Sequence, residues 1–222
     1  MVGSHILNTL RSSPLVSSID MIARRNPQLN EPDKKLTTLV EPDLSKWTGY
    51  FRALSPVPQV YYCAFATTRG AVGGFDNQYK IEHDFNIEMA REAKQAGIKV
   101  FVLVSSAGAD PNSRMGYQKI KGDIEEHVKE LGFDYTVILR PGLIAGDREE
   151  SRPAEAVIRK IADFAGSIHS SLKNFWAQDA DVIAKAAVSA GLKALNGEAP
   201  DKIWIIAQSD IVHLGLTEWK SI

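Results

Sequence analysis

Short apolar runs alternate with helical periodicity along this chain. The apolar runs predict strands at 18–23, 36–40, 60–65, 99–105, 135–140 and 202–207. Apolar residues at helical spacing predict helices at 2–10, 76–96, 117–131 and 179–195, one beginning at Pro153 and a weak one over 47–54. Gly97 and Gly132 directly follow two of these helices, in the position where a left-handed residue commonly ends a helix.

Strands separated by helices need crossover connections, and such connections produce a parallel sheet with helices on both faces. The sequence therefore predicts a doubly wound α/β fold. No repeat, low-complexity tract or linker divides the 222 residues, a length that suits one sizeable domain. We expect a single domain over 1–222, with the elements that shape a substrate site mainly in 141–222.

Charge and cysteine content exclude several classes of protein. Acidic and basic residues are interspersed and the net charge is −1, so nucleic acid is not a predicted partner. Cys63 is the only cysteine, which rules out an internal disulfide. The longest apolar runs, such as 100–104, are far shorter than the roughly 20 residues of a membrane-spanning helix.

The N-terminal segment permits two interpretations. It contains no acidic residue before Asp20, carries Arg11 and is rich in serine, as a mitochondrial presequence would be. Val2 and Ile6 share one helical face, and Pro14 stands where a helix would stop. The proline favours a first helix of the fold.

Candidate cofactor ligands stand at the carboxyl ends of two predicted strands, where doubly wound proteins bind their ligands. Arg24 and Arg25 follow the first strand, and basic residues there suit the 2′-phosphate of NADP. A solvated basic pair explains them equally well. Thr67 and Thr68 follow the third strand and would let a flat cofactor approach the backbone, although turn chemistry alone also explains them.

The strongest group of candidate catalytic residues is Ser106, Tyr117 and Lys121. The serine follows the strand at 99–105, while the tyrosine and the lysine lie four apart on one helical face. A phenol with a pKa of about 10 is a poor acid–base catalyst at neutral pH, but a neighbouring ammonium lowers that pKa. Tyr117 would then exchange a proton with a carbonyl or alcohol whose oxygen the serine holds, and Lys121 would also bind the cofactor ribose. The bare Tyr-x-x-x-Lys motif is weak, and its position between two strands makes it specific.

Four segments resemble the atypical branch of the short-chain dehydrogenase/reductase superfamily, which contains the human Tat-interacting oxidoreductase-like protein and an Fmp52-like fungal family first found in the mitochondrial proteome. The similar segments are 104–110, 117–122, 139–143 and 147–153. The resemblance covers nearly the whole chain and implies a Rossmann-like NAD(P)-binding fold. It implies NADP (NADPH) as the cofactor, with Pro141 and Lys121 beside it.

The resemblance also implies a Gly-x-x-Gly-x-x-Gly loop after a first β-strand, and only Gly3 of its glycines is present here. We therefore expect a fold that lacks its first β-strand and most of the glycine-rich loop, with weakened cofactor binding. The lacking strand would separate the strands at 18–23 and 60–65 by about 9.6 Å, and these unpaired edges should collapse or rearrange. The distance of 11 residues from Ser106 to Tyr117 leaves Ser105 as an alternative to Ser106.

Two classes of function remain open. One is an NADP-dependent oxidoreductase with an unknown small carbonyl or alcohol substrate, which the Ser, Tyr and Lys residues favour. The other is a cofactor-sensing or non-catalytic interaction protein on the same scaffold, which the shortened loop favours. The resemblance implies peripheral association with the mitochondrial outer membrane, and the alternative is a cytoplasmic location. No metal is predicted, because no metal-ligand spacing occurs among His5, His83, His127, His169 and His213.

Overall fold

A computed structural model of the chain describes residues 1–27, 32–145 and 177–221. Its centre is a parallel sheet whose four strands lie in the order β3-β4-β5-β8. The strands are β3 (Val60–Cys63), β4 (Val100–Val104), β5 (Tyr135–Leu139) and β8 (Ile203–Ile206). Each was predicted from an apolar run, and the predicted boundaries are within two residues of the observed ones.

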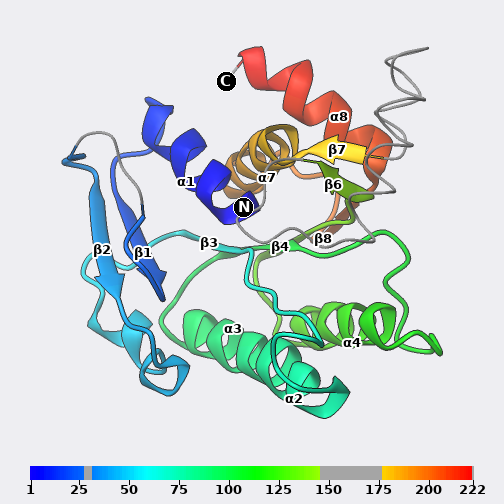
Figure 1. Cartoon of the computed structure of the whole chain (residues 1–222). Helices are drawn as coiled ribbons and strands as arrows, with labels where there is room; N and C mark the ends of the chain where they lie inside the picture. The colour runs from blue at the N-terminus through cyan, green and yellow to red at the C-terminus, as the bar shows by residue number, and fades with distance from the viewer. Residues whose placement is uncertain (28–31, 146–176, 222) are drawn as a thin grey trace.

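Helices cover both faces of this sheet, as a doubly wound fold requires (Figure 1). On one face lie α2 (Phe75–Tyr79), α3 (Phe85–Gln95) and α4 (Gly116–Glu130). On the other face lie α1 (Val2–Ser12), α7 (Ala180–Leu195) and α8 (Gln208–Leu216). The predicted α/β class is confirmed, and Gly97 and Gly132 have the expected positive φ of 99° and 67°.

The two hydrophobic cores lie on opposite faces of β4. Successive side chains of a strand point to opposite faces. Val100 and Val102 accordingly pack with the alanine-rich helix α7, whereas Phe101 and Leu103 pack with α3 and α4. Every residue of β4 is buried, so this strand is the centre of the molecule.

A second, smaller pair of parallel strands lies beyond the β3 side of the sheet (Figure 1). It consists of β1 (Ile19–Ala23) and β2 (Leu36–Val40). No ladder joins β1 to β3 in the part of the chain that the structure describes. The two edges, which were expected to collapse or rearrange, therefore form no ladder with each other. The lack of a first strand between them stays a prediction.

Several elements differ from the periodicity-based prediction. The helix expected at 76–96 contains a π-helical turn, Lys80–Asp84, between α2 and α3. The weak helix expected at 47–54 is instead a pair of 3₁₀ turns, Leu44–Lys46 and Tyr50–Ala53. Four described elements were not predicted: α8, the 3₁₀ turn Glu218–Ser221 and the short paired strands β6 (Leu143–Ala145) and β7 (Ala177–Asp179). The helix expected from Pro153 lies outside the described residues.

The N-terminal segment forms α1, which packs on α7. Val2, Ile6 and Leu7 are buried in that contact, so the interpretation as a first helix of the fold is confirmed. Among the helices that the structure describes, none is both long and apolar enough to cross a membrane.

Candidate active site

Tyr117 and Lys121 open α4 and share one side of it, as their spacing predicted. The Lys121 ammonium lies 5.8 Å from the centroid of the Tyr117 ring. The two side chains differ sharply in exposure: Tyr117 is 46% exposed, whereas Lys121 is among the largest fully buried side chains. The tyrosine therefore faces an open surface, while the charge beneath it is shielded from water.

The partner of the Lys121 ammonium is Glu82, from the π-helical turn before α3. The Nζ and Oε1 atoms are 2.8 Å apart, and both side chains are almost completely buried, at 2% and 0% exposed. Burial by itself would lower the pKa of Lys121, but the attraction of the Glu82 carboxylate outweighs it, so the pKa lies above its ordinary value. Lys121 is therefore charged at neutral pH despite its burial.

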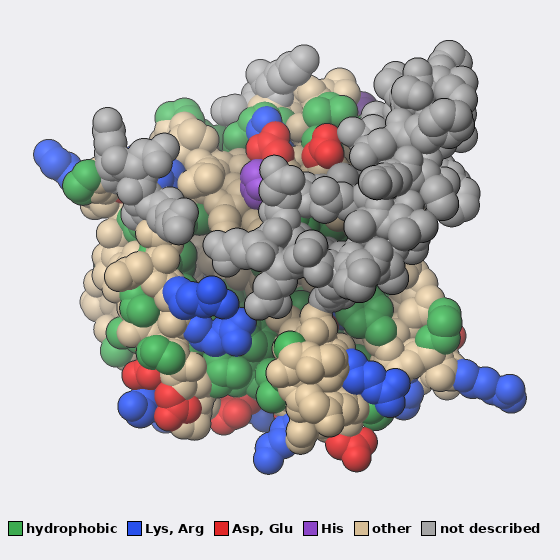
Figure 2. All heavy atoms as spheres, in the orientation of Figure 1, with side chains coloured by type: hydrophobic (Ala, Val, Ile, Leu, Met, Phe, Trp, Pro, Cys, Tyr) green, Lys and Arg blue, Asp and Glu red, His purple; other side chains and the backbone are tan. Residues whose placement is uncertain are grey.

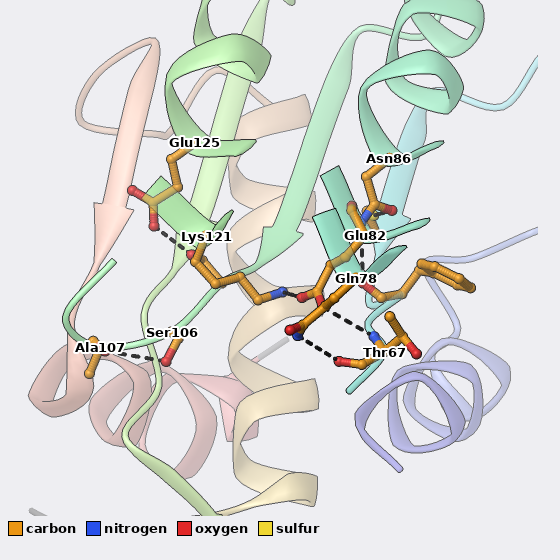
Figure 3. Close-up of polar contacts among 11 residues, drawn as sticks. Thr67, Gln78, Glu82, Asn86, Ser106, Ala107, Lys121 and Glu125 are labelled. Atoms are coloured by element: carbon orange, nitrogen blue, oxygen red, sulfur yellow. Dashed lines mark hydrogen bonds and ion pairs between the residues drawn. The ribbon is translucent and has the colours of Figure 1, made fainter. Parts of the chain in front are cut away.

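Glu82 also holds the loop that follows β3. Its Oε2 accepts hydrogen bonds from the Thr67 backbone N–H and from the Gln78 side chain, each at 3.3 Å. The Gln78 amide also donates to the Thr67 carbonyl oxygen at 3.3 Å. Figure 3 shows Lys121 extended toward Glu82 and Thr67 on the far side of that carboxylate. One carboxylate thus connects a candidate catalytic lysine to a candidate cofactor loop.

The two candidate serines have different environments. Ser105 is buried, and its hydroxyl donates to Oε1 of Glu125 at 2.5 Å. Glu125 in turn accepts two hydrogen bonds of 3.1 Å from Nε of Arg140. Ser106 is only partly buried, and its hydroxyl donates to the neighbouring Ala107 carbonyl at 3.2 Å. The Ser105 hydroxyl is therefore occupied by its buried hydrogen bond to Glu125, whereas the partly buried Ser106 hydroxyl could bind a ligand.

The loop that carries Ser106 is fixed at both ends. Pro141, a buried residue after β5, accepts a hydrogen bond of 2.7 Å from the Ala107 N–H. On the other side, a Cβ added to Gly122 of α4 would lie 2.2 Å from the backbone nitrogen of Pro111. Only glycine permits so close an approach of helix and loop. Pro141, predicted to contact the cofactor, thus supports the loop of Ser106.

The candidate phosphate-binding end is the N-terminus of α1. The first turn contains no acidic residue, so no carboxylate competes for its backbone N–H groups. A Cβ on Gly3 would lie 3.7 Å from the Cβ of Ala64, at the end of β3. A helix N-terminus beside a strand end, without acidic residues, fits the pyrophosphate of a dinucleotide.

The two candidate arginines follow β1 and are exposed. The Arg24 guanidinium lies over the ring of Phe65, 5.7 Å from its centroid. Phe65 is in the loop after β3, two residues before Thr67. The structure therefore brings Arg24 close to the loop of Thr67 and Thr68, although no ladder joins their two strands.

Glu82 was not identified from the sequence. The sequence does contain a pattern that could have indicated it. Gln78, Glu82 and Asn86 follow one another at intervals of four residues, on the helical face that continues to the buried Ala90 and Ala93. A polar stripe on the buried face of a helix needs partners, because unpaired buried polar groups are costly. The partner itself, Lys121, could not be assigned without the tertiary structure.

The coloured side chains in Figure 2 form no single-sign field on this face. Lys and Arg side chains occur there in small groups, between acidic and hydrophobic ones. In the described ranges, no three His, Cys, Asp or Glu side chains converge in a way that could hold a metal ion.

Comparisons with known proteins agree with this geometry. A family model described as NAD(P)H-binding matches residues 1–170. The mitochondrial protein fmp52 of Aspergillus niger is 59% identical over 220 residues, which cover 97% of this chain and 94% of that relative. The FMP52 protein of Coccidioides immitis is 45% identical over 232 residues, covering 99% of this chain and 94% of that relative.

Solved structures with this fold include two nucleotide-sugar epimerases. The UDP-N-acetylglucosamine 4-epimerase of Methanobrevibacter ruminantium has a TM-score of 0.63 at 21% identity, covering 93% of this chain and 72% of that chain. The UDP-glucose 4-epimerase of Thermus thermophilus, solved with NAD, has a TM-score of 0.63 at 14% identity, covering 99% of this chain and 80% of that chain. At these identities the likeness shows the fold alone.

The fold and the matching family model define the class: this is an NAD(P)H-binding α/β protein of Rossmann-like architecture. Within that class, the chain belongs to the Fmp52 mitochondrial protein family, of the atypical short-chain dehydrogenase/reductase type. The family resemblance stated from the sequence is confirmed.

Proposed function

We propose that this protein is an NADPH-dependent oxidoreductase that interconverts a small carbonyl compound and its alcohol, with Tyr117, Lys121 and Ser106 at the reacting centre. The observation that carries the proposal is the buried, charged Lys121 directly beneath the exposed Tyr117. A stable cation under a phenol is the arrangement that turns tyrosine into an acid–base catalyst near neutral pH.

Each side chain has a distinct task. When bound, the nicotinamide ring donates or accepts the hydride. Tyr117 donates its phenolic proton to the carbonyl oxygen during reduction and takes it back during oxidation. Lys121 stabilises the resulting phenolate through its charge and offers its remaining N–H groups to the cofactor ribose. Ser106 donates a hydrogen bond to the substrate oxygen and orients it toward Tyr117.

The cofactor end is proposed to use Gly3, Arg24, Arg25, Thr67 and Thr68. The preference for NADPH over NADH rests on Arg24 and Arg25, which stand after β1 where the adenosine ribose of a dinucleotide is held. The arginine charge attracts the 2′-phosphate of NADPH, whereas the neutral 2′-hydroxyl of NADH offers no ion pair.

The test has two stages. Fluorescence titration with NADPH measures cofactor binding, and the absence of saturable binding would refute the cofactor assignment. A panel of aldehydes and ketones is then offered with NADPH to the wild type and to Tyr117→Phe. The proposal requires at least one substrate whose reduction falls by a factor of about 10² or more in the variant. Unchanged turnover in Tyr117→Phe would refute the assignment of Tyr117 as the acid–base catalyst.

The serine assignment is tested by a matched pair of substitutions. Ser106→Ala is expected to lower turnover about tenfold or more, because the substrate oxygen loses a donor, and to leave thermal stability unchanged. Ser105→Ala should instead lower stability, because the Glu125 carboxylate loses a buried donor. A loss of turnover confined to Ser105→Ala would reverse the assignment.

A second function is favoured by the separation of β1 from β3 in the described part of the chain. The same scaffold would then sense the cofactor or serve as a non-catalytic interaction protein. NADPH binding together with equal inertness of the wild type and Tyr117→Phe toward the whole carbonyl panel would support this alternative.

We also propose a peripheral location on the mitochondrial outer membrane, supported by the mitochondrial relatives in Aspergillus niger and Coccidioides immitis. Peripheral attachment predicts release from isolated mitochondria by alkaline carbonate and digestion by protease added outside intact organelles. Recovery in the cytosolic fraction alone would contradict it.

A further inference from the structure

Glu82 is the most completely buried charged side chain near Lys121, and the family resemblance assigned it no role. We propose that Glu82 is a positioning residue for the proposed reaction: it keeps the Lys121 ammonium charged beneath Tyr117 and connects it to the cofactor loop at Thr67. This inference rests on the proposed function and adds a residue to it.

The charge argument starts from burial. A lysine that is 2% exposed cannot hold its proton through contact with water. The Glu82 carboxylate, 2.8 Å from Nζ, supplies the compensating charge. Among the described residues, no other carboxylate forms an ion pair within 4.0 Å of the Lys121 Nζ atom. Removing the Glu82 charge therefore leaves Lys121 without compensation.

The position of Glu82 is fixed by contacts of residues on either side of it in the sequence. His83 Nε2 lies 2.8 Å from Nδ1 of His127, farther along α4. Tyr79 donates a hydrogen bond of 3.1 Å to Asp123, also on α4. Contacts on both sides of Glu82 thus fasten the turn to the helix that carries Lys121. A π-helical turn is rare, and such turns are frequent at functional sites.

The link to the cofactor loop runs through the second carboxylate oxygen. Oε2 accepts the Thr67 backbone N–H at 3.3 Å, so movement of that loop changes the surroundings of the same carboxylate that holds Lys121. Asn86 strengthens this connection, because its side-chain amide donates to the Glu82 carbonyl at 2.6 Å and to the Phe65 carbonyl at 3.3 Å. Occupancy of the loop and placement of the ammonium are therefore coupled.

Glu125 is a second buried carboxylate, and its ion pair differs from that of Glu82 in the exposure of the cation. Glu125 of α4 is 1% exposed and pairs with Arg140, whose side chain is 32% exposed. Arg140 can keep its charge through water and through its intrinsically high pKa. Lys121 has neither support. Glu125→Gln is therefore the matched control: it removes a buried carboxylate of equal burial without touching Lys121.

The first experiment measures the titration of Lys121 in the chain without cofactor, by ¹³Cε NMR of labelled lysine, with the signal assigned from a Lys121→Met spectrum. We expect Lys121 to stay charged beyond pH 10 in the wild type and in Glu125→Gln. In Glu82→Gln its pKa should fall by about two pH units or more. Glu82→Asp, which restores the charge, should recover most of that fall. An unchanged titration in Glu82→Gln would overturn the proposal.

A second measurement covers the case in which Glu82→Gln does not fold. Lys121→Met leaves the Glu82 carboxylate buried and unpaired, so it should be strongly destabilised. The double variant Glu82→Gln/Lys121→Met removes both charges and should be more stable than Lys121→Met alone, because neutral replacements of a buried pair are tolerated better than half a pair. Additive losses in this cycle would contradict a direct pairing of the two residues.

A functional readout separates this proposal from the proposed function. With a substrate available, Glu82→Gln should lose activity at alkaline pH values at which the wild type keeps it, because Lys121 then loses its proton within the tested range and no longer stabilises negative charge on Tyr117. A purely structural role would lower the rate at all pH values equally. If the wild type binds no NADPH, the proposed function fails, while the NMR titration still decides whether Glu82 sets the charge of Lys121.

Discussion

The four-stranded sheet and the separate β1–β2 pair are built very differently. β4, with the sequence Val-Phe-Val-Leu-Val, is buried at every residue because strands flank it on both sides and helices cover both faces. β1, with the sequence Ile-Asp-Met-Ile-Ala, has only Ile19 buried, and no residue of β2 is buried. Burial in this fold thus follows the number of neighbours that a strand has.

This difference divides the candidate site in two. The candidate catalytic residues Ser106, Tyr117 and Lys121 belong to the densely packed region, at the end of β4 and on helix α4. Arg24 and Arg25 follow β1, on the sparsely packed pair. We expect rigid geometry at the candidate catalytic end and adjustable geometry at the end proposed to bind the cofactor phosphate.

The largest expected effect comes from truncating matched leucines in the two regions. Leu103 of β4 is 1% exposed and Leu39 of β2 is 39% exposed. Leu103→Ala should lower the free energy of unfolding by about 2–5 kcal/mol, because it leaves a cavity in a close-packed core. Leu39→Ala should change it by no more than about 0.5 kcal/mol. Urea denaturation measures both, and equal losses would contradict the comparison.

Alanine substitutions at two glycines test the same contrast between the densely packed sheet region and the N-terminal region. At Gly122 the new Cβ would clash with the backbone at Pro111, so Gly122→Ala should cost about 1–3 kcal/mol and displace the Ser106 loop. At Gly3 the nearest atom would be at an ordinary 3.7 Å, so Gly3→Ala should leave stability unchanged or raise it by roughly 0.5–1 kcal/mol. Thermal unfolding distinguishes the two. NADPH affinity should nevertheless fall in Gly3→Ala if the backbone there meets the pyrophosphate.

The arginines test whether the sparse pair serves the cofactor. Arg24→Ala/Arg25→Ala should weaken NADPH binding about tenfold, or about 1.4 kcal/mol, because a 2′-phosphate loses its counter-charge. NADH affinity should remain as in the wild type. Equal losses for NADPH and NADH would show that the arginines support the fold or the common part of the cofactor instead.

The smallest expected effect is a pH dependence confined to the N-terminal region. The pKa of Asp33 is lowered, first by the hydrogen bond from the Lys35 backbone and then by Arg11 of α1. A folded-state pKa below the unfolded value contributes stability above the unfolded pKa of about 3.9, and that contribution is lost as the pH falls through the folded value.

The measurement compares urea midpoints of the wild type and Asp33→Asn between pH 6 and pH 2. The wild type should be the more stable protein at pH 6, and the difference should shrink toward zero on acidification. A difference that stays constant with pH would show that the Asp33 charge contributes nothing to the docking of α1.

Much of the fold follows from local pattern. The continuous apolar run of β4 and the exact match of β2 to the predicted 36–40 show that strand positions are encoded by short-range hydrophobicity. The positive φ of Gly97 and Gly132 follows in the same way, because helix ends select glycine locally. The π-helical turn and the 3₁₀ turns were missed, since hydrophobic periodicity does not distinguish such short turns from an α-helix.

The sequence by itself determined the α/β class, the shared helical face of Tyr117 and Lys121, and the placement of Ser106 and Arg24 at strand ends, because periodicity and strand direction are local properties. The tertiary structure alone decided that Glu82 pairs with Lys121, 39 positions later in the numbering, and that Ser105 is occupied by Glu125. Such pairings depend on which buried charges meet across packed elements. Burial makes these partners necessary, but only the folded arrangement of α3, α4 and the sheet selects them.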